Sequence, residues 1–594
     1  MARQATAEAR PQAVEATAEA VQEDTEDKDT HLIQTVMKKT ALTVLLAVAA
    51  CFAAHSQGAY DAWLFSENNY EGTARTVAMG NAFTALGGDL GAVTINPASS
   101  AVAGYSQLTL TPSLTFSTNT ATGVPYKGSV DPYFQKTIRS RMTKAGIPNI
   151  GFTFNYKTGR SSGLKAMAFG FVANMTNSWC EDVFAEGTNS QTSFLAAAAA
   201  DATDQIRWLN ENKAAGEPDF TKEDFMHEDA FKYMNWQDIL GYRSGMFSAY
   251  DAEGKEFVAA TEKLLENGQL TQPGEVGQKY GRSVSGNKYE YLFNFGANIS
   301  DFIYVGVNLG INSISYDYTR YFKENATDPY MFENTFIDSN GAELTTYFKN
   351  ATYKYSYSDD GTGIFGKIGV IVTPGAGLRF GAAIQTPSTT TIKEQWQDMA
   401  STSFTDSSCN GEAESELGRS EYIFNSPWRF NFGLAYTLGR FAVVSADYEV
   451  ANYGGMKYMT DDMNDEDFEY FEEINEDIRQ TYGAEHQLRI GAEVKPLSFL
   501  AVRAGYNLKT PALKMDKKVE NGEEPIYYQN LSFGIGYSSK KSFFADLACR
   551  YTFPVNEDIH TYSDYLAEFD GPLPPEIRNI HSNWKLLLTL GWRF

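Results

Sequence analysis

The chain ends in the segment "NWKLLLTLGWRF", residues 583–594, in which two kinds of side chain alternate. The even-numbered row is apolar throughout and consists of Trp584, Leu586, Leu588, Leu590, Trp592 and Phe594. The odd-numbered row is mixed and includes Lys585, Thr589 and Arg593. Alternation with a period of two predicts a β-strand, and about 9–11 residues suffice for a strand to cross a membrane. We therefore expect the apolar row to face lipid and the mixed row to face a polar lumen.

Alternation of this kind recurs from residue 106 to the end of the chain. The expected strands are 106–116, 147–157, 164–175, 291–299, 303–311, 351–373, 377–396, 428–438, 442–450, 488–494, 500–506, 531–537, 543–551 and 584–594, and 351–396 can also be divided differently. The connections are alternately long and short, and the longest is 176–288. Short turns on one rim and long loops on the other are typical of an outer-membrane barrel with an even number of strands. The fold class indicated is all-β, a transmembrane antiparallel β-barrel of about 14 strands.

The composition agrees with a barrel and excludes other classes. Aromatic residues make up 14% of the chain, yet no run of about 18 apolar residues occurs, as a membrane-spanning helix would require. Alternation dilutes apolar residues in a barrel, which explains the combination. The net charge of −25 argues against a nucleic-acid partner, because nucleic acids bind clustered Lys and Arg.

The first 56 residues predict export from the cytoplasm. Residues 1–36 are polar and acidic, which is typical of disorder, and we interpret them as an extension from a miscalled start, with translation beginning at Met37. Residues 37–56 combine a basic start, a short apolar stretch and small residues, as a signal peptide does. The competing interpretation is a lipoprotein, because Val48-Ala49-Ala50-Cys51 resembles a lipobox.

Residues 57–105 differ from the rest because they do not alternate and are punctuated by glycine. A ring of fourteen strands leaves a lumen too wide for side chains alone to fill, and a segment of about 50 residues could close it. We therefore expect a hatch (plug) at 57–105, followed by the barrel at 106–594.

Short motifs in the expected hatch carry a resemblance to a known family. They are Gly80-Asn81-Ala82, Gly88-Asp89 and Asn96-Pro97-Ala98, together with "GAAIQTP" at 381–387 and "DYEV" at 447–450. In these motifs and in its layout the chain resembles the long-chain fatty acid transporter family of outer-membrane proteins, which includes aromatic-hydrocarbon channels. It departs from that family in the length of the loop 176–288, so no ligand contacts are transferred from the loops.

The resemblance implies a passive transporter in the bacterial outer membrane for long-chain fatty acids or other small hydrophobic molecules. External loops would capture the substrate, the hatch would move, and the substrate would leave sideways through the barrel wall. The closing aromatics Trp592 and Phe594 resemble the signal read by the barrel-insertion machinery. Expected partners are therefore the substrate, that machinery and outer-membrane lipids, with the protein itself a monomer.

The strand 164–175 is the candidate for the lateral exit because it is apolar on both faces. Gly170 lies between Phe169 and Phe171, and a glycine within a strand can mark a bend or bulge. An ordinary strand beside the hatch fits the same residues equally well.

The loops contain three expected helices, at 194–212, at 253–268 and within the acidic segment 461–480. The third has an apolar stripe formed by Phe468, Phe471, Ile474 and Ile478. Three interpretations remain open for it: a solvated acidic helix, an apolar capture surface at the barrel mouth, or a divalent-cation site at Asp465, Asp467 and Glu469.

Signals for catalysis are weak, so we expect no enzyme, no cofactor and no metal site. Gly361–Gly366 matches G-x-G-x-x-G, but it begins an alternating strand and opens no helix, as a nucleotide loop would. Cys180 and Cys409 both fall in expected external loops and are candidates for a disulfide. The alternative function is a barrel whose large loops bind proteins, such as a secretion shuttle or an adhesin.

Overall fold

The computed structural model describes residues 58–125, 133–214, 216–337, 342–459, 465–515, 526–539, 542–566 and 571–594. The expected extension 1–36, the expected signal peptide 37–56 and Cys51 lie outside the described residues. The chain divides into two units at His55, and everything below concerns the second unit, Ser56–Phe594.

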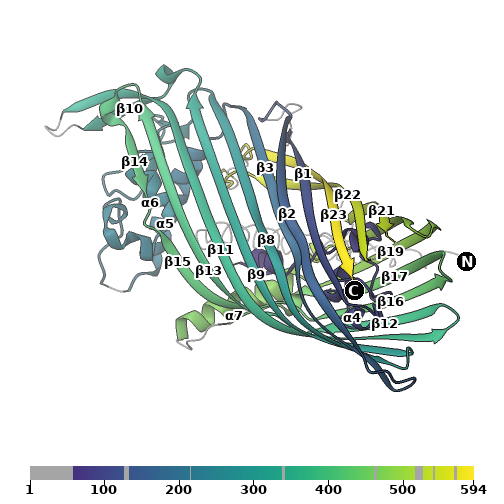
Figure 1. The fold of residues 1–594 in the computed structure, drawn as a ribbon. Coiled ribbons are helices and arrows are strands. Elements are labelled where there is room, and N and C mark those ends of the chain that lie inside the picture. Colours follow the sequence, from purple (N-terminus) through teal and green to yellow (C-terminus); the bar gives the residue numbers. More distant parts are fainter. Residues whose placement is uncertain are drawn as a thin grey trace, which may run out of the picture. The chain divides into compact units, whose positions relative to one another are not determined.

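A single antiparallel sheet closes on itself to form a fourteen-stranded barrel in the described residues (Figure 1). In order around the ring, the strands are β1 (Gln107–Val124), β2 (Ile138–Lys157), β3 (Leu164–Asn189), β8 (Val276–Ile299), β9 (Ile303–Ala326), β11 (Glu343–Gly375), β12 (Leu378–Gln385), β16 (Arg429–Leu438), β17 (Ala442–Asn452), β19 (Ala484–Leu497), β20 (Leu500–Lys509), β21 (Tyr528–Ser538), β22 (Phe543–His560) and β23 (Glu576–Arg593). The last strand closes the ring by pairing with the first, from Gln107–Arg593 to Val124–Glu576. The barrel predicted from the terminal segment is therefore confirmed.

At two positions around the barrel, the wall is formed by two strands that follow one another end to end. β12 continues as β13 (Thr389–Phe404), and β16 is preceded by β15 (Gly418–Asn425). Pro387 lies between β12 and β13, and Pro427 lies between β15 and β16. Each proline interrupts its strand because it has no backbone N–H to donate to the neighbouring strand. Short strands extend the sheet at the loop end: β10 (Glu333–Ile337), β14 (Gly411–Glu414) and β18 (Lys457–Met459).

Many strands of the barrel are much longer than the roughly 9–11 residues that are needed to cross a membrane. β11 has 33 residues and β3 has 26. Because β3 and β8 continue far beyond the apolar part, the long connection is 190–275 and not 176–288. The predicted strands end where the apolar alternation of the sequence ends. In the structure, β3 and β8 stay paired beyond that point, as far as Asn189 and Val276.

An apolar band surrounds the barrel. Each of the fourteen strands in the ring carries at least one large apolar side chain that is exposed to the outside. On β23, Trp584 and Trp592 flank Leu586 and Leu588, and all four are more than a third exposed. Eight residues of strand span about 26 Å, which matches the apolar band of about 25 Å between two aromatic girdles. Among the described residues, no helix is long and apolar enough to cross a membrane.

The depth of this band leads to a stability prediction. Leu588→Arg places a charge midway between the two tryptophans, and we expect it to destabilise the barrel in lipid by about 2–4 kcal/mol. Ile580→Arg, on the same strand but beyond Trp584, should cost only about 0–1 kcal/mol. Urea unfolding of the two variants in phospholipid vesicles, followed by tryptophan fluorescence, measures the difference. Equal costs would contradict the placement of the band.

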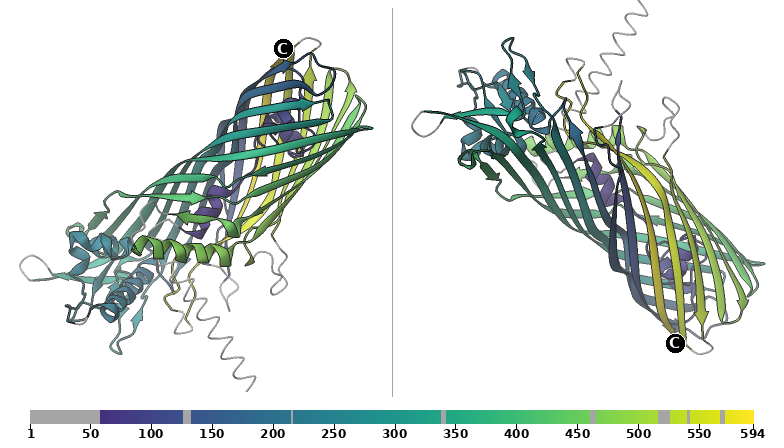
Figure 2. Two further views of the ribbon diagram at one scale, coloured as in Figure 1. Left: turned by 90° about the horizontal axis from the view of Figure 1, so that it is seen from below. Right: turned by 90° about the horizontal axis from the view of Figure 1, so that it is seen from above.

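Helices and short hairpins gather at the loop end, and the C-terminus lies at the opposite end (Figure 2). α5 (Phe194–Asn212) confirms the first expected helix, and α7 (Asp465–Thr481) confirms the third. The helix expected at 253–268 is wrong: this segment forms β5 (Phe257–Ala259) and β6 (Lys263–Leu264). β5 pairs with β4 (Phe247–Ala249), and its Phe257 is buried, so tertiary packing overrides local helix propensity.

Two further expectations about the loops can be settled. Along α7, Ile478 is buried, Phe471 and Ile474 are partly buried in the same core, and Phe468 is exposed. The stripe therefore packs inward at one end, whereas the side chains of Asp465, Asp467 and Glu469 lie outside the described residues. Cys180 and Cys409 are free thiols, so the candidate disulfide is not formed.

Candidate functional site

The expected hatch residues lie inside the barrel as short helical turns. These are α2 (Ala59–Ser66), α3 (Ala74–Ala78), η1 (Gly91–Val93) and α4 (Ser99–Val102). Most of the segment from residue 70 to 101 is buried, so it contacts the wall on several sides.

A belt of glycines on the inner wall lets the hatch backbone come this close. At each of them, an added Cβ would lie less than 3.0 Å from a hatch atom, a separation that real Cβ atoms essentially never show. The belt consists of Gly296, Gly306, Gly369, Gly381, Gly433, Gly491, Gly505 and Gly534. Several members are direct partners across strands, such as Gly296–Gly306 and Gly491–Gly505. The wall is therefore shaped to the hatch.

The first hatch motif forms a tight turn. Gly80 and Asn81 both have positive φ, at 61° and 62°, which glycine adopts freely and asparagine tolerates. The Asn81 side chain donates to the carbonyl of Tyr70 at 2.8 Å, and Ala82 is fully buried. These residues fix the path of the hatch backbone.

The other motif residues also hold the hatch together and attach it to the wall. Asp89, next to Gly88, accepts hydrogen bonds from Thr73 Oγ1 at 2.6 Å and from the Gly91 amide at 2.9 Å. Asn96 Nδ2 donates to the carbonyl of Thr84 at 2.7 Å and to that of Val370 in β11 at 3.2 Å.

The Pro97 carbonyl accepts from Asn294 of β8 at 3.0 Å, and Ala98 is buried beside it. Thus both the Gly-Asn-Ala and the Asn-Pro-Ala motifs act as structural connectors. The two strand motifs also meet the hatch, since Asp447 accepts from the Thr84 amide at 2.6 Å and Gly381 belongs to the belt.

Buried ion pairs link the hatch to the part of the wall formed by β19, β20, β22 and β23. Glu67 pairs with Lys509 of β20 at 2.5 Å, and Glu71 pairs with both Lys585 of β23 and Arg550 of β22. Arg75 pairs with Glu493 of β19 at 3.0 Å. None of these charged hatch residues is recognisable from the sequence, because a single charged residue in an irregular segment carries no pattern.

The wall itself has a break between β2 and β3. The two strands pair from Lys157–Ala166 up to Asn149–Asn174, and above that point β3 continues with β8 alone. The β3–β8 register also shifts between Met175 and Asn177. Across the sheet, Gly146 at the break is level with Ser113, and Ser113 is level with Leu587. Leu587 lies between Trp584 and Trp592, so the break begins near the middle of the apolar band.

The break lies above the position that the sequence suggested. Gly170 is paired on both sides, with Thr153 and with Asn294, so the strand does not open there. A Cβ at Gly170 would lie 2.7 Å from the carbonyl oxygen of Phe152, so the glycine permits close approach of two strands. Phe169 and Phe171 contact Phe295 and Phe293 at ring distances of 5.1 and 5.4 Å on the neighbouring strand.

The hatch binds directly at this break. The amides of Asn69 and Glu71 donate to the carbonyls of Thr176 and Met175 at 2.7 and 2.9 Å. Above it, Lys144 of β2 donates to the Trp179 carbonyl of β3 at 3.0 Å. The unpaired stretch is therefore bounded by a ladder below and a lysine above, and hatch segment 67–71 lines its inner side.

Above the hatch, the lumen contains a cluster of aromatic side chains around α2, which we call the aromatic cluster. Its members are Tyr60, Trp63, Phe65, Trp179, Tyr316, Tyr318, Tyr357, Tyr422 and Tyr458. Tyr316 meets Phe65 at a ring distance of 6.0 Å and Trp179 at 5.1 Å. Trp179 also carries the carbonyl that Lys144 binds, so the cluster adjoins the break.

The Tyr60 ring shows that this part of the lumen is not filled. Tyr60 lies on α2 inside the barrel, yet 56% of its surface is accessible. Its neighbour Asp61 is buried and accepts from the Gly58 amide at 3.2 Å; burial raises the pKa of Asp61 to about 7. An apolar or aromatic molecule beside Tyr60 would meet rings and a carboxyl that is largely neutral below that pH.

A charged band lies above the cluster. Arg282 of β8 holds Glu557 through two bonds of 2.7 and 2.6 Å and also reaches Glu181 at 3.1 Å. Arg320 of β9 is the direct cross-strand partner of Arg282 and faces the same side. Arg282 and its two carboxylates together carry one net negative charge, and Arg320 adds a second cation at this level of the lumen.

The external subdomain formed by 190–275 closes over one side of the mouth. At the start of α5, the Phe194 amide and the Ser193 hydroxyl donate to Glu324 of β9 at 2.8 and 2.6 Å. Phe194 packs against Phe322 and Tyr353, which point inward from the upper strands. The large loop is therefore a packed cap on the barrel wall.

Among the described residues, no group of three or more His, Cys, Asp or Glu side chains could hold a metal ion. The Gly361–Gly366 segment lies within β11 and opens no helix, as expected.

No family model and no curated protein matches the chain. Solved structures that are similar include the P. putida toluene transporter TodX, at 13% identity over 88% of this chain and 99% of that one, with a TM-score of 0.44. The Ralstonia pickettii toluene transporter TbuX has 13% identity over 89% and 99%, with a TM-score of 0.43. A Pseudomonas aeruginosa FadL homologue has 11% identity over 88% and 98%, with a TM-score of 0.47. At such low identities, the function has to be inferred from this chain's own geometry.

Proposed function

We propose that the protein is a passive channel of the bacterial outer membrane for small hydrophobic molecules. The observation that carries this proposal is the aromatic cluster, which lies between a closed hatch and the cap and adjoins a break in the wall at the depth of the lipid core. A water-filled pore would give an apolar molecule no stabilisation, whereas each methylene buried among these rings contributes about 0.8 kcal/mol.

The path follows from the order of these parts. A molecule that enters beside the cap reaches Tyr60 and the rings around it. Straight passage downward is blocked by the hatch, which the glycine belt holds against the wall. The break between β2 and β3 offers the other way out, because hatch segment 67–71 binds at its inner side through two backbone hydrogen bonds and its outer side is at lipid depth.

Release then requires a local movement of the hatch. If segment 67–71 withdraws, the amides of Asn69 and Glu71 leave the carbonyls of β3. The molecule can partition into the bilayer without crossing water, since the surrounding outer face is apolar. No energy source is needed, because transfer from a dilute aqueous phase into lipid is itself favourable.

Two substrate classes suit this lumen, and we propose that long-chain fatty acids are included. The rings would accept uncharged aromatic compounds, while Arg320 could pair with an acyl carboxylate at the level above them. Comparison of toluene with laurate therefore tests the finer assignment.

The release step can be tested at Gly146, whose position on β2 faces the Met175 side chain across the break. A Cβ there would lie 3.3 Å from Met175 Cε, so Gly146→Trp should fill the unpaired stretch. We expect it to reduce accumulation of toluene and laurate in proteoliposomes to the level of protein-free vesicles, while binding to the detergent-solubilised barrel persists. Gly277→Trp, on β8 at the loop end where the nearest atom is 3.8 Å away, is the matched control.

The outcomes separate the steps of the proposal. Uptake by Gly146→Trp at the wild-type rate would exclude lateral release at this break. Absence of saturable binding of both compounds to the wild-type barrel would refute the channel itself. Heat-modifiable migration on gels verifies that each variant is folded.

A further inference from the structure

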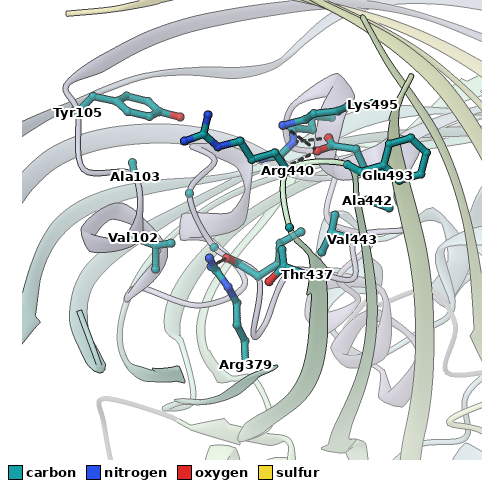
Figure 3. Close-up of a pocket in the computed structure, with 16 residues that line it drawn as sticks. Val102, Ala103, Tyr105, Arg379, Thr437, Arg440, Ala442, Val443, Glu493 and Lys495 are labelled. Carbon is teal, nitrogen blue, oxygen red and sulfur yellow. Dashed lines mark hydrogen bonds and ion pairs between the residues drawn. The ribbon is translucent and has the colours of Figure 1, made fainter. Parts of the chain in front are cut away.

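A second cavity lies below the hatch, on the rim opposite the cap (Figure 3). It has a volume of about 220 Å³ and is bounded by the hatch on one side and by the turn between β16 and β17 on the other. The hatch contributes Leu86, Val102 and Tyr105, and the turn contributes Arg440 and Phe441. The aromatic cluster shares no residue with this cavity, which is therefore a separate site.

The cavity is strongly positive. Arg75, Arg379, Arg440 and Lys495 line it, against the single carboxylate of Glu493. The surplus remains positive when Arg503, Asp89 and Asp546, which pair with these groups, are included. Such a cluster stands out in a chain with a net charge of −25.

The one carboxylate is already fully engaged. Glu493 accepts from Arg75 at 3.0 Å and from Arg503 at 2.6 Å, and Lys495 lies 3.5 Å from it. By contrast, Arg440 forms no hydrogen bond or ion pair within the part of the chain that the structure describes. Figure 3 shows its guanidinium extending across the mouth toward Tyr105, with Lys495 beside Glu493. Positive charge thus faces an open cavity without a matching anion.

The cavity also has an apolar side. Leu86 and Val102 from the hatch and Phe441 from the turn between β16 and β17 line it next to the cations. A small inorganic anion would leave these side chains without contact. A molecule with an anionic head and a short apolar portion would satisfy both sides.

We propose that this cavity binds the anionic head group of an amphiphile, a carboxylate or a phosphate, with its first carbons against Leu86 and Val102. Arg440 and Lys495 donate charge-assisted hydrogen bonds to the head group. The ligand is either a free amphiphile or an anionic phospholipid of the inner leaflet, since the two share this chemistry. The proposal is independent of the proposed channel function, because it concerns a different cavity on the other rim.

Chemical protection of Lys495 tests the proposal site by site. The side chain of Lys495 is 48% exposed and open to acetylation, and Lys157, exposed on the same rim, serves as an internal reference. The full-length barrel in neutral detergent is acetylated in the presence of octanoate, octanol or inorganic phosphate. The extent of acetylation at the two lysines is then quantified by mass spectrometry. At about four times Kd, octanoate should slow acetylation of Lys495 about fivefold relative to Lys157.

Two further comparisons test the role of Arg440 and distinguish a free amphiphile from a phospholipid as the ligand. Arg440→Gln should weaken the protection by octanoate about tenfold in apparent affinity, whereas Arg160→Gln, on the β2–β3 turn of the same rim, should leave it unchanged. Protection in phosphatidylglycerol nanodiscs but not in phosphatidylcholine would identify the head group as that of a lipid. Equal protection by octanol, or none from octanoate, phosphate or phosphatidylglycerol, would overturn the proposal. Binding of toluene is measured in parallel, so that a failure of the channel proposal is recognised separately.

Discussion

Glu71→Gln is expected to release the hatch from the barrel wall. The Glu71 carboxylate is the partner of two cations, Lys585 and Arg550, and the Lys585 side chain is only 2% exposed. Removing one member of a buried ion pair costs about 3–5 kcal/mol, because the remaining charge stays buried without compensation. The same residue donates its amide to Met175 at the break, so loss of the anchor should also free segment 67–71.

The expected readout is the ionic conductance of single barrels in planar bilayers. The wild-type hatch should keep the channel closed, and the variant should show frequent openings, since each 1.4 kcal/mol lost raises the displaced population about tenfold. The triple variant Glu71→Leu, Lys585→Met and Arg550→Met replaces all three charged groups by apolar side chains and should restore closure in large part. Glu186→Gln, which removes the partner of the exposed Lys136, should leave conductance unchanged. Quiet traces from Glu71→Gln would show that the ion pairs do not hold the hatch.

Such a role for Glu71 could not be read from the sequence, although much of the barrel could. The final strand predicted its own orientation, because alternation in 584–594 needs no knowledge of its neighbours. The hatch is predicted by the opposite property, the lack of alternation before residue 106. By contrast, an ion pair such as Glu71–Lys585 joins residues 514 positions apart, and only the fold brings them together.

The break in the wall shows what a local rule cannot supply. Gly170 lies between Phe169 and Phe171 in its strand, and a glycine in a strand does permit a bend. In the folded barrel Gly170 permits close strand approach instead, and the pairing of β3 with β2 ends four residues later, at Asn174, where the two strands diverge. Divergence depends on the register with a second strand, which one strand's sequence does not contain.

The glycine belt could have been detected in part. Its members lie on the inward row of their strands, where the sequence gives Gly in place of the polar residues expected in a water-filled lumen. Gly491 and Gly505, for example, sit in the two strands that most clearly alternate. An inward row rich in glycine is therefore a sign that something solid fills the barrel.

Gly369→Val is the strongest single test of that belt. A Cβ at Gly369 of β11 would collide with Asn96 and would lie 2.9 Å from Pro97 Cδ. The Asn96 side chain would lose its hydrogen bonds to Thr84 and Val370, which join the hatch to itself and to the wall. Overpacking of this kind costs about 1–3 kcal/mol, and each lost bond about 1 kcal/mol more.

Because the collision is with the hatch and not with the barrel, we expect the hatch alone to loosen. Hydrogen–deuterium exchange should rise by roughly 100- to 1,000-fold or more in peptides covering 79–99, while peptides from β1 and β23 remain protected. Gly366→Val is the matched control: it lies on the same strand but faces outward, with its nearest neighbouring atom 3.9 Å away. Valine also suits a strand better than glycine does, so the control should exchange as slowly as the wild type. If both variants exchanged alike, the hatch would owe its position to something other than the glycines of the wall.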